Sequence, residues 1–158
     1  MVAVFGGERL HEFIGGRPLA LDELRDRYAR LVAGSGKADE VWLNWIVRLR
    51  ADSQPVGPVQ ATLTTDGGHW TAHGAWVIGA KFQNQGFASE AARALVEWLR
   101  EQGVEDIVAN VHRDHRASAV VATRAGLLPT DDNADGEQVW RFPTTRAAGR
   151  DYPDGFSS

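Results

Sequence analysis

Gln83-Asn84-Gln85-Gly86-Phe87-Ala88 stands where the sequence changes its period. Before this segment, apolar and polar residues alternate over residues 41–50, 59–63 and 70–78, which is typical of half-buried strands. After it, apolar residues recur over residues 88–99 at the spacing of an amphipathic helix. The segment therefore joins a strand to a helix, and its glycine falls at the helix start.

The sequence on both sides predicts an α+β fold. A helical segment within residues 1–36 precedes three antiparallel strands, the last two joined by a hairpin at Asp66-Gly67-Gly68. The helix over residues 88–99 then leads to a strand at 107–111, which makes that strand parallel to the third one, with a right-handed crossover. A helix over residues 116–125 and a hairpin around Asp135-Gly136 complete a mixed sheet.

Composition restricts the class of protein. The 158 residues suffice for one domain, expected over residues 1–143 with its core at 41–142, followed by a flexible tail at 144–158. The chain has no cysteine, which excludes disulfides, thiol catalysis and thiolate metal sites. Its net charge of −4 argues against nucleic-acid binding. Without a long apolar run or a signal peptide, we expect a cytoplasmic protein without a membrane partner.

The helix start at Gly86 is a candidate anion site. A helix N-terminus presents unpaired N–H groups and the positive end of the helix dipole. Gly86 lets an anion approach the backbone, and the small side chain of Ala88 keeps the first turn open. An ordinary helix start without a ligand is the alternative explanation of the same residues.

Several segments, in order, resemble one family. They are Trp76-Val77-Ile78-Gly79, then Gln83, Gly86 and Ala88-Ser89-Glu90-Ala91, then Ala109-Asn110-Val111-His112, then Asp114-His115-Arg116-Ala117-Ser118 with Ala125-Gly126-Leu127. Together they resemble the GNAT superfamily of N-acetyltransferases, in particular its RimJ/RimL-like branch, which acetylates ribosomal proteins. The resemblance implies a GNAT-like sheet with splayed central strands, acetyl-coenzyme A (acetyl-CoA) as the donor, and a small-molecule or peptide amine as the acceptor.

The resemblance also assigns residues to the cofactor. The backbone N–H groups of residues 85–89 would hold the pyrophosphate, and pantetheine would pair with the strand edge at residues 76–78, like an added strand. Asn110 and Ser118 would face pantetheine from the other side, and Arg93, Arg113 and Arg116 would supply positive charge, although each arginine is equally explained as a solvated surface residue. The predicted cofactor-binding residues are Trp76, Val77, Ile78, Gln83, Gln85, Gly86, Phe87, Ala88, Ser89, Asn110, Arg113, His115 and Arg116.

The sequence departs from the family pattern in two places. His115 stands where the family usually has an asparagine, three residues before the serine. The family also begins with a strand, of which only Val2–Phe5 could be a remnant here. The missing strand would alter the acceptor side, where Asn44, Gln60, His73 and the pair Asp131-Asp132 are candidate lining residues. It would also favour a homodimer, because large side chains such as Trp42, Trp45 and Trp70 lie near the exposed edge.

Two functions are consistent with these residues. In the first, a deprotonated primary amine attacks the thioester directly, a backbone N–H near Val77–Ile78 stabilises the oxyanion, and Ser118 is the catalytic residue that serves the leaving thiolate. His115 would orient pantetheine without acting as the general base. Ser118 could instead merely cap its helix. In the second, the chain is a non-catalytic acyl-CoA-binding module. Neither function requires a metal.

Overall fold

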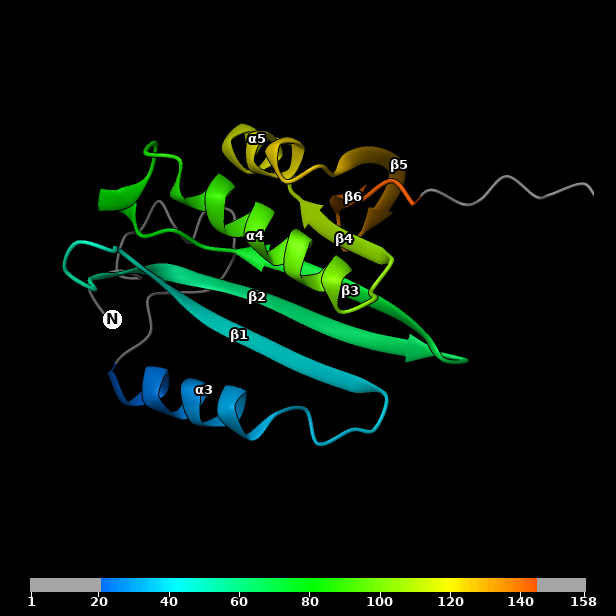
Figure 1. The fold of residues 1–158 in the computed structure, drawn as a ribbon, viewed down its shortest axis with the longest axis horizontal. Coiled ribbons are helices and arrows are strands. Elements are labelled where there is room, and N and C mark those ends of the chain that lie inside the picture. Colours follow the sequence, from blue (N-terminus) through cyan, green and yellow to red (C-terminus); the bar gives the residue numbers. More distant parts are fainter. Residues whose placement is uncertain (1–20, 145–158) are drawn as a thin grey trace, which may run out of the picture.

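The computed structural model describes residues 21–144. In order, it contains α3 (Leu21–Ala33), β1 (Glu40–Arg48), β2 (Pro55–Asp66), β3 (His69–Trp76), η1 (Ala80–Phe82), α4 (Phe87–Glu101), β4 (Asp106–Val111), α5 (Arg116–Arg124), β5 (Leu128–Ala134) and β6 (Glu137–Arg141) (Figure 1). The strands form one mixed sheet in the order β1-β2-β3-β4-β6-β5. The predicted α+β fold is confirmed. The predicted remnant strand at 2–5, the first part of the helical segment and all but the first residue of the predicted tail at 144–158 lie outside the described residues.

The two predicted hairpin turns adopt the backbone that their sequences favour. Gly67 and Gly68 have φ of 58° and 87°, and Asp66 pairs directly with His69. Asp135 and Gly136 have φ of 51° and 83° between β5 and β6. Positive φ at both central positions matches the right-handed twist of the flanking strands, so these turns fix the register of both hairpins.

Helix α4 covers one face of the sheet. It contacts β2, β3 and α5, while α5 packs against β4. The buried side chains of α4 repeat at the predicted helical spacing and meet apolar residues of the strands, such as Ala61, Ala72 and Ile107. The buried residues of α4 are Ala92, Leu95, Val96 and Leu99.

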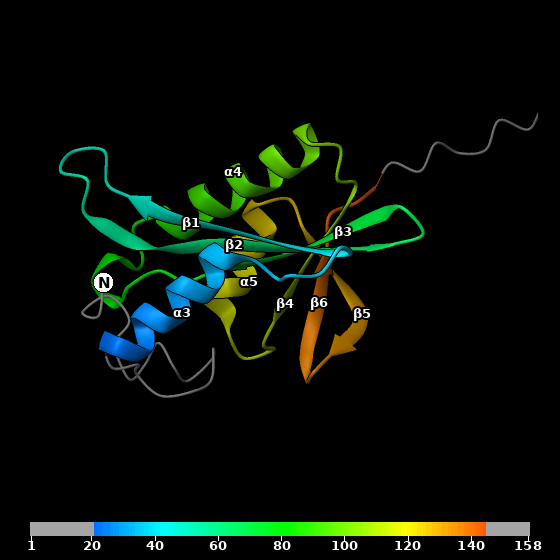
Figure 2. The ribbon, with the colours of Figure 1, turned by 90° about the horizontal axis from the view of Figure 1, so that it is seen from below.

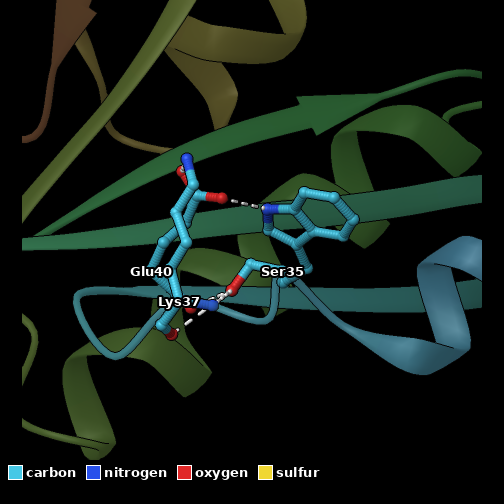
Figure 3. A network of polar contacts seen from close by, with 4 residues as sticks. Ser35, Lys37 and Glu40 are labelled. Carbon is cyan, nitrogen blue, oxygen red and sulfur yellow. Dashed lines mark hydrogen bonds and ion pairs between the residues drawn. The ribbon is translucent and has the colours of Figure 1, made fainter.

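Strand β1 is one edge of the sheet. On the side of α4, Trp45 meets Trp98 edge-on, with ring centroids 5.3 Å apart. The connection from α3 to β1 is held by polar contacts (Figure 3). There Lys37 pairs with the Glu40 carboxylate at 3.6 Å, and Ser35 Oγ donates to the Glu40 carbonyl oxygen. These contacts fix the start of β1 and leave α3 beside this edge (Figure 1).

The sheet divides between β3 and β4. The two strands are parallel, but only residues 71–73 of β3 pair with residues 106–108 of β4. Beyond this point, β3 stays with β2, while residues 108–111 of β4 pair with β6. Figure 2 shows β1–β3 running steeply across the direction of β4, β6 and β5. The central strands are therefore splayed, as the resemblance predicted.

Candidate functional site

A cavity of about 710 Å³ lies beside the end of β3, past the residues at which β3 pairs with β4. Its wall comes from the end of β3, the loop before α4, the first turn of α4, and the whole length of α5 with the loop before it. The lining residues are Trp76, Val77, Ile78, Phe82, Gln83, Asn84, Gly86, Phe87, Ala88, Ser89, Asp114, His115, Arg116, Ala117, Ser118, Val120, Val121 and Arg124. Two helices thus begin at the same hollow.

At the start of α4, the N-cap depends on backbone conformation and has no side-chain cap. Gly86 is the N-cap residue with φ of 86°, and Asn84 also has a positive φ of 60°. Asparagine and glycine adopt this conformation at least cost. Glu90 N–H donates to the Gly86 carbonyl at 3.0 Å, so the N–H groups of residues 87–89 precede the first intrahelical bond. A β-carbon at position 86 would have open space within 4 Å, which leaves room for a ligand.

Two glutamine side chains brace this loop. The Gln83 amide donates to the Ile78 carbonyl at 3.1 Å, and the Gln85 amide donates to the Lys81 carbonyl at 3.1 Å. Both bonds close the loop on itself. Gln83 lines the cavity, whereas the side chain of Gln85 does not. The resemblance assigned the backbone N–H of Gln85 to the pyrophosphate, and Gln85 is not among the residues that line the cavity.

At the start of α5, a side chain caps the helix. His115 is the N-cap residue, and its Nδ1 accepts a hydrogen bond from Ser118 N–H at 3.0 Å. Because Nδ1 is the acceptor, the neutral imidazole carries its proton on Nε2. Ser118 is therefore not the cap of its helix, and that alternative explanation is wrong. An asparagine at position 115 would accept the same bond, since asparagine is among the best N-cap residues.

Trp76 connects the two walls. Its indole Nε1 donates to Ser118 Oγ at 3.2 Å, from the end of β3 to the first turn of α5. The indole also packs against the main core. This contact joins two lining residues of the cavity, one at the end of β3 and one on α5.

Both positive and negative side chains line the cavity, and they lie on α5 or in the loop before it. Arg116 and Arg124 lie on the α5 side with Asp114, and all three side chains are exposed. Arg93 instead faces Glu97 on the wet face of α4, at 3.9 Å. The positive charge beside the cavity thus comes from α5.

Three predicted residues do not bring their side chains to the cavity: Gln85, Asn110 and Arg113. Asn110 is exposed on the face of β4 opposite Ala109 and Val111, which are buried in the main core. The Arg113 guanidinium donates to Asn133 Oδ1 at 3.0 Å and so is directed to β5. Strand alternation explains Asn110, but nothing in the sequence pairs Arg113 with a residue on a later strand.

The backbone donor at the gap needs a correction. Val77 N–H donates to the Pro58 carbonyl at 3.0 Å, and Gly79 N–H donates to the Val56 carbonyl at 2.9 Å. Both groups belong to the ladder with β2, so Val77 cannot serve an oxyanion. Since peptide groups alternate along an extended chain, the N–H groups of Trp76 and Ile78 face the opposite side, toward the gap.

Some wall residues escaped the sequence analysis. Phe82 is buried in η1 and meets Phe87 edge-on, with ring centroids 6.4 Å apart. Val121 and Arg124 follow Ala117 by four and seven residues on α5. Helical spacing from Ala117 could have identified both, whereas Phe82 gives no periodic signal because η1 is only three residues long.

Within residues 21–144, no group of three His, Cys, Asp or Glu side chains could hold a metal ion. The helices in this part of the chain are too short or too polar to cross a membrane.

Comparison with known proteins identifies the family of this chain. A family model described as "Acetyltransferase (GNAT) domain" matches residues 1–128. No curated protein matches the chain. Among solved structures, the aminoglycoside acetyltransferase AAC(6')-Ib in complex with paromomycin and acetyl-CoA has a TM-score of 0.70 and 19% identity, over 98% of this chain and 91% of that chain.

Two further structures have the same fold. Spermidine N-acetyltransferase from Vibrio cholerae, in complex with CoA and spermine, has a TM-score of 0.66 and 15% identity, over 89% of this chain and 84% of that chain. An acetyltransferase from Agrobacterium tumefaciens has a TM-score of 0.65 and 21% identity, over 90% and 82% respectively. With the family model covering most of the sequence and the splayed sheet in place, the chain belongs to the GNAT acetyltransferase family.

Proposed function

We propose that the chain transfers the acetyl group of acetyl-CoA to a primary amine by direct attack. The observation that carries this proposal is the cavity between two helix N-termini at the gap of a splayed sheet. Family membership supports an acyltransferase, and similar structures contain CoA or acetyl-CoA.

The start of α4 suits the pyrophosphate. Backbone N–H groups of residues 87–89 lie at the positive end of the helix dipole, where an anion is favoured. Gly86 presents no side chain to a phosphate oxygen, and Arg116 and Arg124 add positive charge from α5. On a chain of net charge −4, this local arrangement favours an anionic ligand.

The gap suits pantetheine, which carries amide groups like an extended peptide. The edge of β3 that faces away from β2 presents peptide groups of Trp76 and Ile78 to the cavity. An amide ligand can bind such an edge as an added strand does. Asn110 would face this ligand only from the edge of β4, because its side chain is outside the cavity wall.

The reaction needs no covalent enzyme intermediate. The neutral amine nitrogen forms a bond to the thioester carbon, and the carbonyl oxygen becomes an oxyanion that the N–H of Trp76 or Ile78 stabilises. The oxyanion then re-forms the carbonyl as the carbon–sulfur bond breaks, the nitrogen loses its extra proton to solvent water, and CoA leaves as a thiolate. Ser118 donates a hydrogen bond to that sulfur. His115 is not the base in this proposal, because its Nδ1 already accepts from Ser118 N–H.

The proteins that this chain resembles act on three classes of amine, which are the candidate acceptors. The RimJ/RimL-like resemblance of the sequence favours a protein N-terminus. Similar structures are named for spermidine and for aminoglycosides. An acceptor panel therefore contains peptides with a free N-terminus, polyamines and aminoglycosides. Asn44, whose Oδ1 accepts from Gln60 at 2.7 Å, and His73 lie on the sheet face opposite the core and are candidates for contact with the acceptor.

The test has two stages. Acetyl-CoA should raise the melting temperature, since a ligand at one hundred times its Kd stabilises the folded state by about 2.7 kcal/mol. Release of free thiol is then measured over the acceptor panel. Binding with release supports the proposal, whereas binding without release from any acceptor indicates a non-catalytic acyl-CoA-binding module. Failure to bind contradicts both functions.

Self-association stays a prediction. Trp45 and Trp98 are 37% and 38% exposed at the β1 edge, which a second copy of the chain could cover. Light scattering of the full chain at tens of micromolar tests it, and a monomer would contradict it.

A further inference from the structure

The contact between Trp76 and Ser118 has a direction. The indole N–H can only donate, so Ser118 Oγ accepts in this 3.2 Å bond. A serine hydroxyl has two acceptor lone pairs and one proton. The bond therefore occupies one lone pair and leaves the O–H proton for another partner.

Ser118 is also held from its backbone side. Its N–H donates to His115 Nδ1 at 3.0 Å, which fixes the first turn of α5. Among the described residues, no hydrogen bond is donated by the Ser118 hydroxyl. Because Ser118 and Trp76 both line the cavity, the remaining proton is available there to a ligand atom that can accept it.

We propose that Trp76 is a positioning residue for the leaving group: its indole N–H orients the Ser118 hydroxyl so that this hydroxyl donates to the sulfur of CoA. This inference rests on the proposed function. Trp76 acts through Ser118 and not on the substrate by its side chain. The role is separate from that of its backbone, which faces the gap.

The proposal is specific to the N–H group of the indole. Trp76 also packs against the core, so removing the whole side chain would disturb the fold as well as Ser118. Phenylalanine keeps most of the aromatic body and lacks the donor. Trp76→Phe therefore separates the hydrogen bond from the packing.

The experiment compares CoA with desulfo-CoA and needs no acceptor. Calorimetry gives the Kd of both compounds at pH about 7 and about 9.5, on either side of an ordinary thiol pKa of about 8.5. A donor to the sulfur favours the thiolate, so we expect wild-type protein to prefer CoA over desulfo-CoA by about tenfold more at the higher pH. In Trp76→Phe and in Ser118→Ala, this gain should fall to about twofold or less. The double variant should lose nothing further.

Trp98→Phe is the matched control. Trp98 lies on α4, is 38% exposed, contacts Trp45 and does not line the cavity, so the same exchange there should preserve the alkaline gain. Melting without ligand checks the folding of each variant, and Trp76→Leu replaces Trp76→Phe if the latter does not fold.

The remaining outcomes separate the two proposals. If Trp76→Phe keeps the gain while Ser118→Ala loses it, Trp76 does not position the hydroxyl. If wild-type protein binds CoA without an alkaline gain, the further inference is wrong, and so is the hydrogen bond from Ser118 to the leaving sulfur. Acetyl transfer by direct attack still stands in that case. If wild-type protein binds neither compound, the proposed function fails, and this inference fails with it.

Discussion

The two helices that begin at the cavity start in opposite ways. Helix α4 has a glycine at its N-cap and no side-chain cap, and residues 87–89 of its first turn line the cavity. Helix α5 has a histidine, His115, at its N-cap. The His115 side chain accepts a hydrogen bond from the N–H of Ser118, the third residue of the helix. Both helices carry a serine at the third helical position, Ser89 in α4 and Ser118 in α5, and both serines line the cavity. The first helix offers its backbone to a ligand, and the second offers side chains.

An uncapped helix start needs support from elsewhere. For α4 this support is β2, which holds the chain before the helix by its backbone. Val77 and Gly79 donate to carbonyls of β2, and Gly57 lies so close that a β-carbon there would be 1.9 Å from the Val77 oxygen. The start of α4, which has no side-chain cap, is therefore held by backbone contacts with β2, outside the helix itself.

Gly57→Ala should have the largest effect, because it separates β2 from the strand that carries α4. The β-carbon would meet backbone atoms, which cannot move aside cheaply, so we expect a loss of about 3 kcal/mol in the free energy of unfolding. For a chain of this size, the melting temperature should fall by roughly 6–12 °C. Thermal melting measures it.

Gly74→Ala is the control on β3. A β-carbon there would lie 3.6 Å from Leu95, which is ordinary contact, so the melting temperature should change little. Equal losses in the two variants would show that β2 has no special part in holding α4.

Gly86→Glu should remove the stabilisation by acetyl-CoA. The side chain would enter the proposed pyrophosphate site and add a negative charge at the helix start. Up to about 2.7 kcal/mol of ligand stabilisation would be lost at one hundred times Kd. The thermal shift with acetyl-CoA measures this loss.

Gly103→Glu controls for backbone strain. Gly103 follows the other end of α4 with φ of 82°, against 86° at Gly86, and also has open space around it. Both variants should lose stability by about 1–2 kcal/mol without ligand, but only Gly103→Glu should keep the shift. A retained shift in Gly86→Glu would place the pyrophosphate elsewhere.

Ser118→Ala should lower kcat by about 10-fold to 100-fold, or about 1.4–2.8 kcal/mol in activation free energy, through loss of the donor to the leaving sulfur. Ser89→Ala keeps the backbone N–H at the same position of the other helix. We expect it to raise KM for acetyl-CoA and to change kcat by about twofold or less. Steady-state thiol release measures both constants. Similar effects of the two exchanges on kcat would contradict the different parts assigned to the helices.

His115→Asn should have the smallest effect. Asparagine can accept the bond from Ser118 N–H, so stability should change by about 0.5 kcal/mol or less, whereas His115→Ala should lose about 1 kcal/mol. The rate of His115→Asn should stay near that of wild type. A pH–rate profile that loses its acidic limb in this variant would identify His115 as the base.

Local signals predicted most of the fold. Alternation predicted the meander, the turn residues Asp66-Gly67-Gly68 and Asp135-Gly136 predicted the hairpins, and helical spacing predicted α4, because each depends on residues that are near in sequence. The bulge in β5 was not predicted. There the pairing with β6 shifts between Pro129 and Asn133, and Thr130 donates to the Val139 carbonyl, a contact made across strands.

For the candidate site, the sequence predicted the backbone part but not the contacts between side chains. Residues 83–88 predicted Gly86 at the start of a helix, because a backbone site depends on local sequence. Side-chain partners were not readable: Trp76 meets Ser118 and Arg113 meets Asn133 only after the strands have assembled. The same reason explains why the predicted oxyanion donor near Val77–Ile78 included Val77, because its partner Pro58 lies on another strand.

The contact between Trp76 and Ser118 also bears on how the molecule folds. These residues are 42 positions apart, and η1, α4 and β4 all lie between them. Closing so long a loop is entropically unfavourable until the parallel strands have paired, and contacts of this kind slow folding. Neither the β1–β3 hairpins nor α4 alone can present both walls of the cavity. Binding of acetyl-CoA in a refolding experiment should therefore appear only after the crossover has docked, later than the recovery of helical circular dichroism.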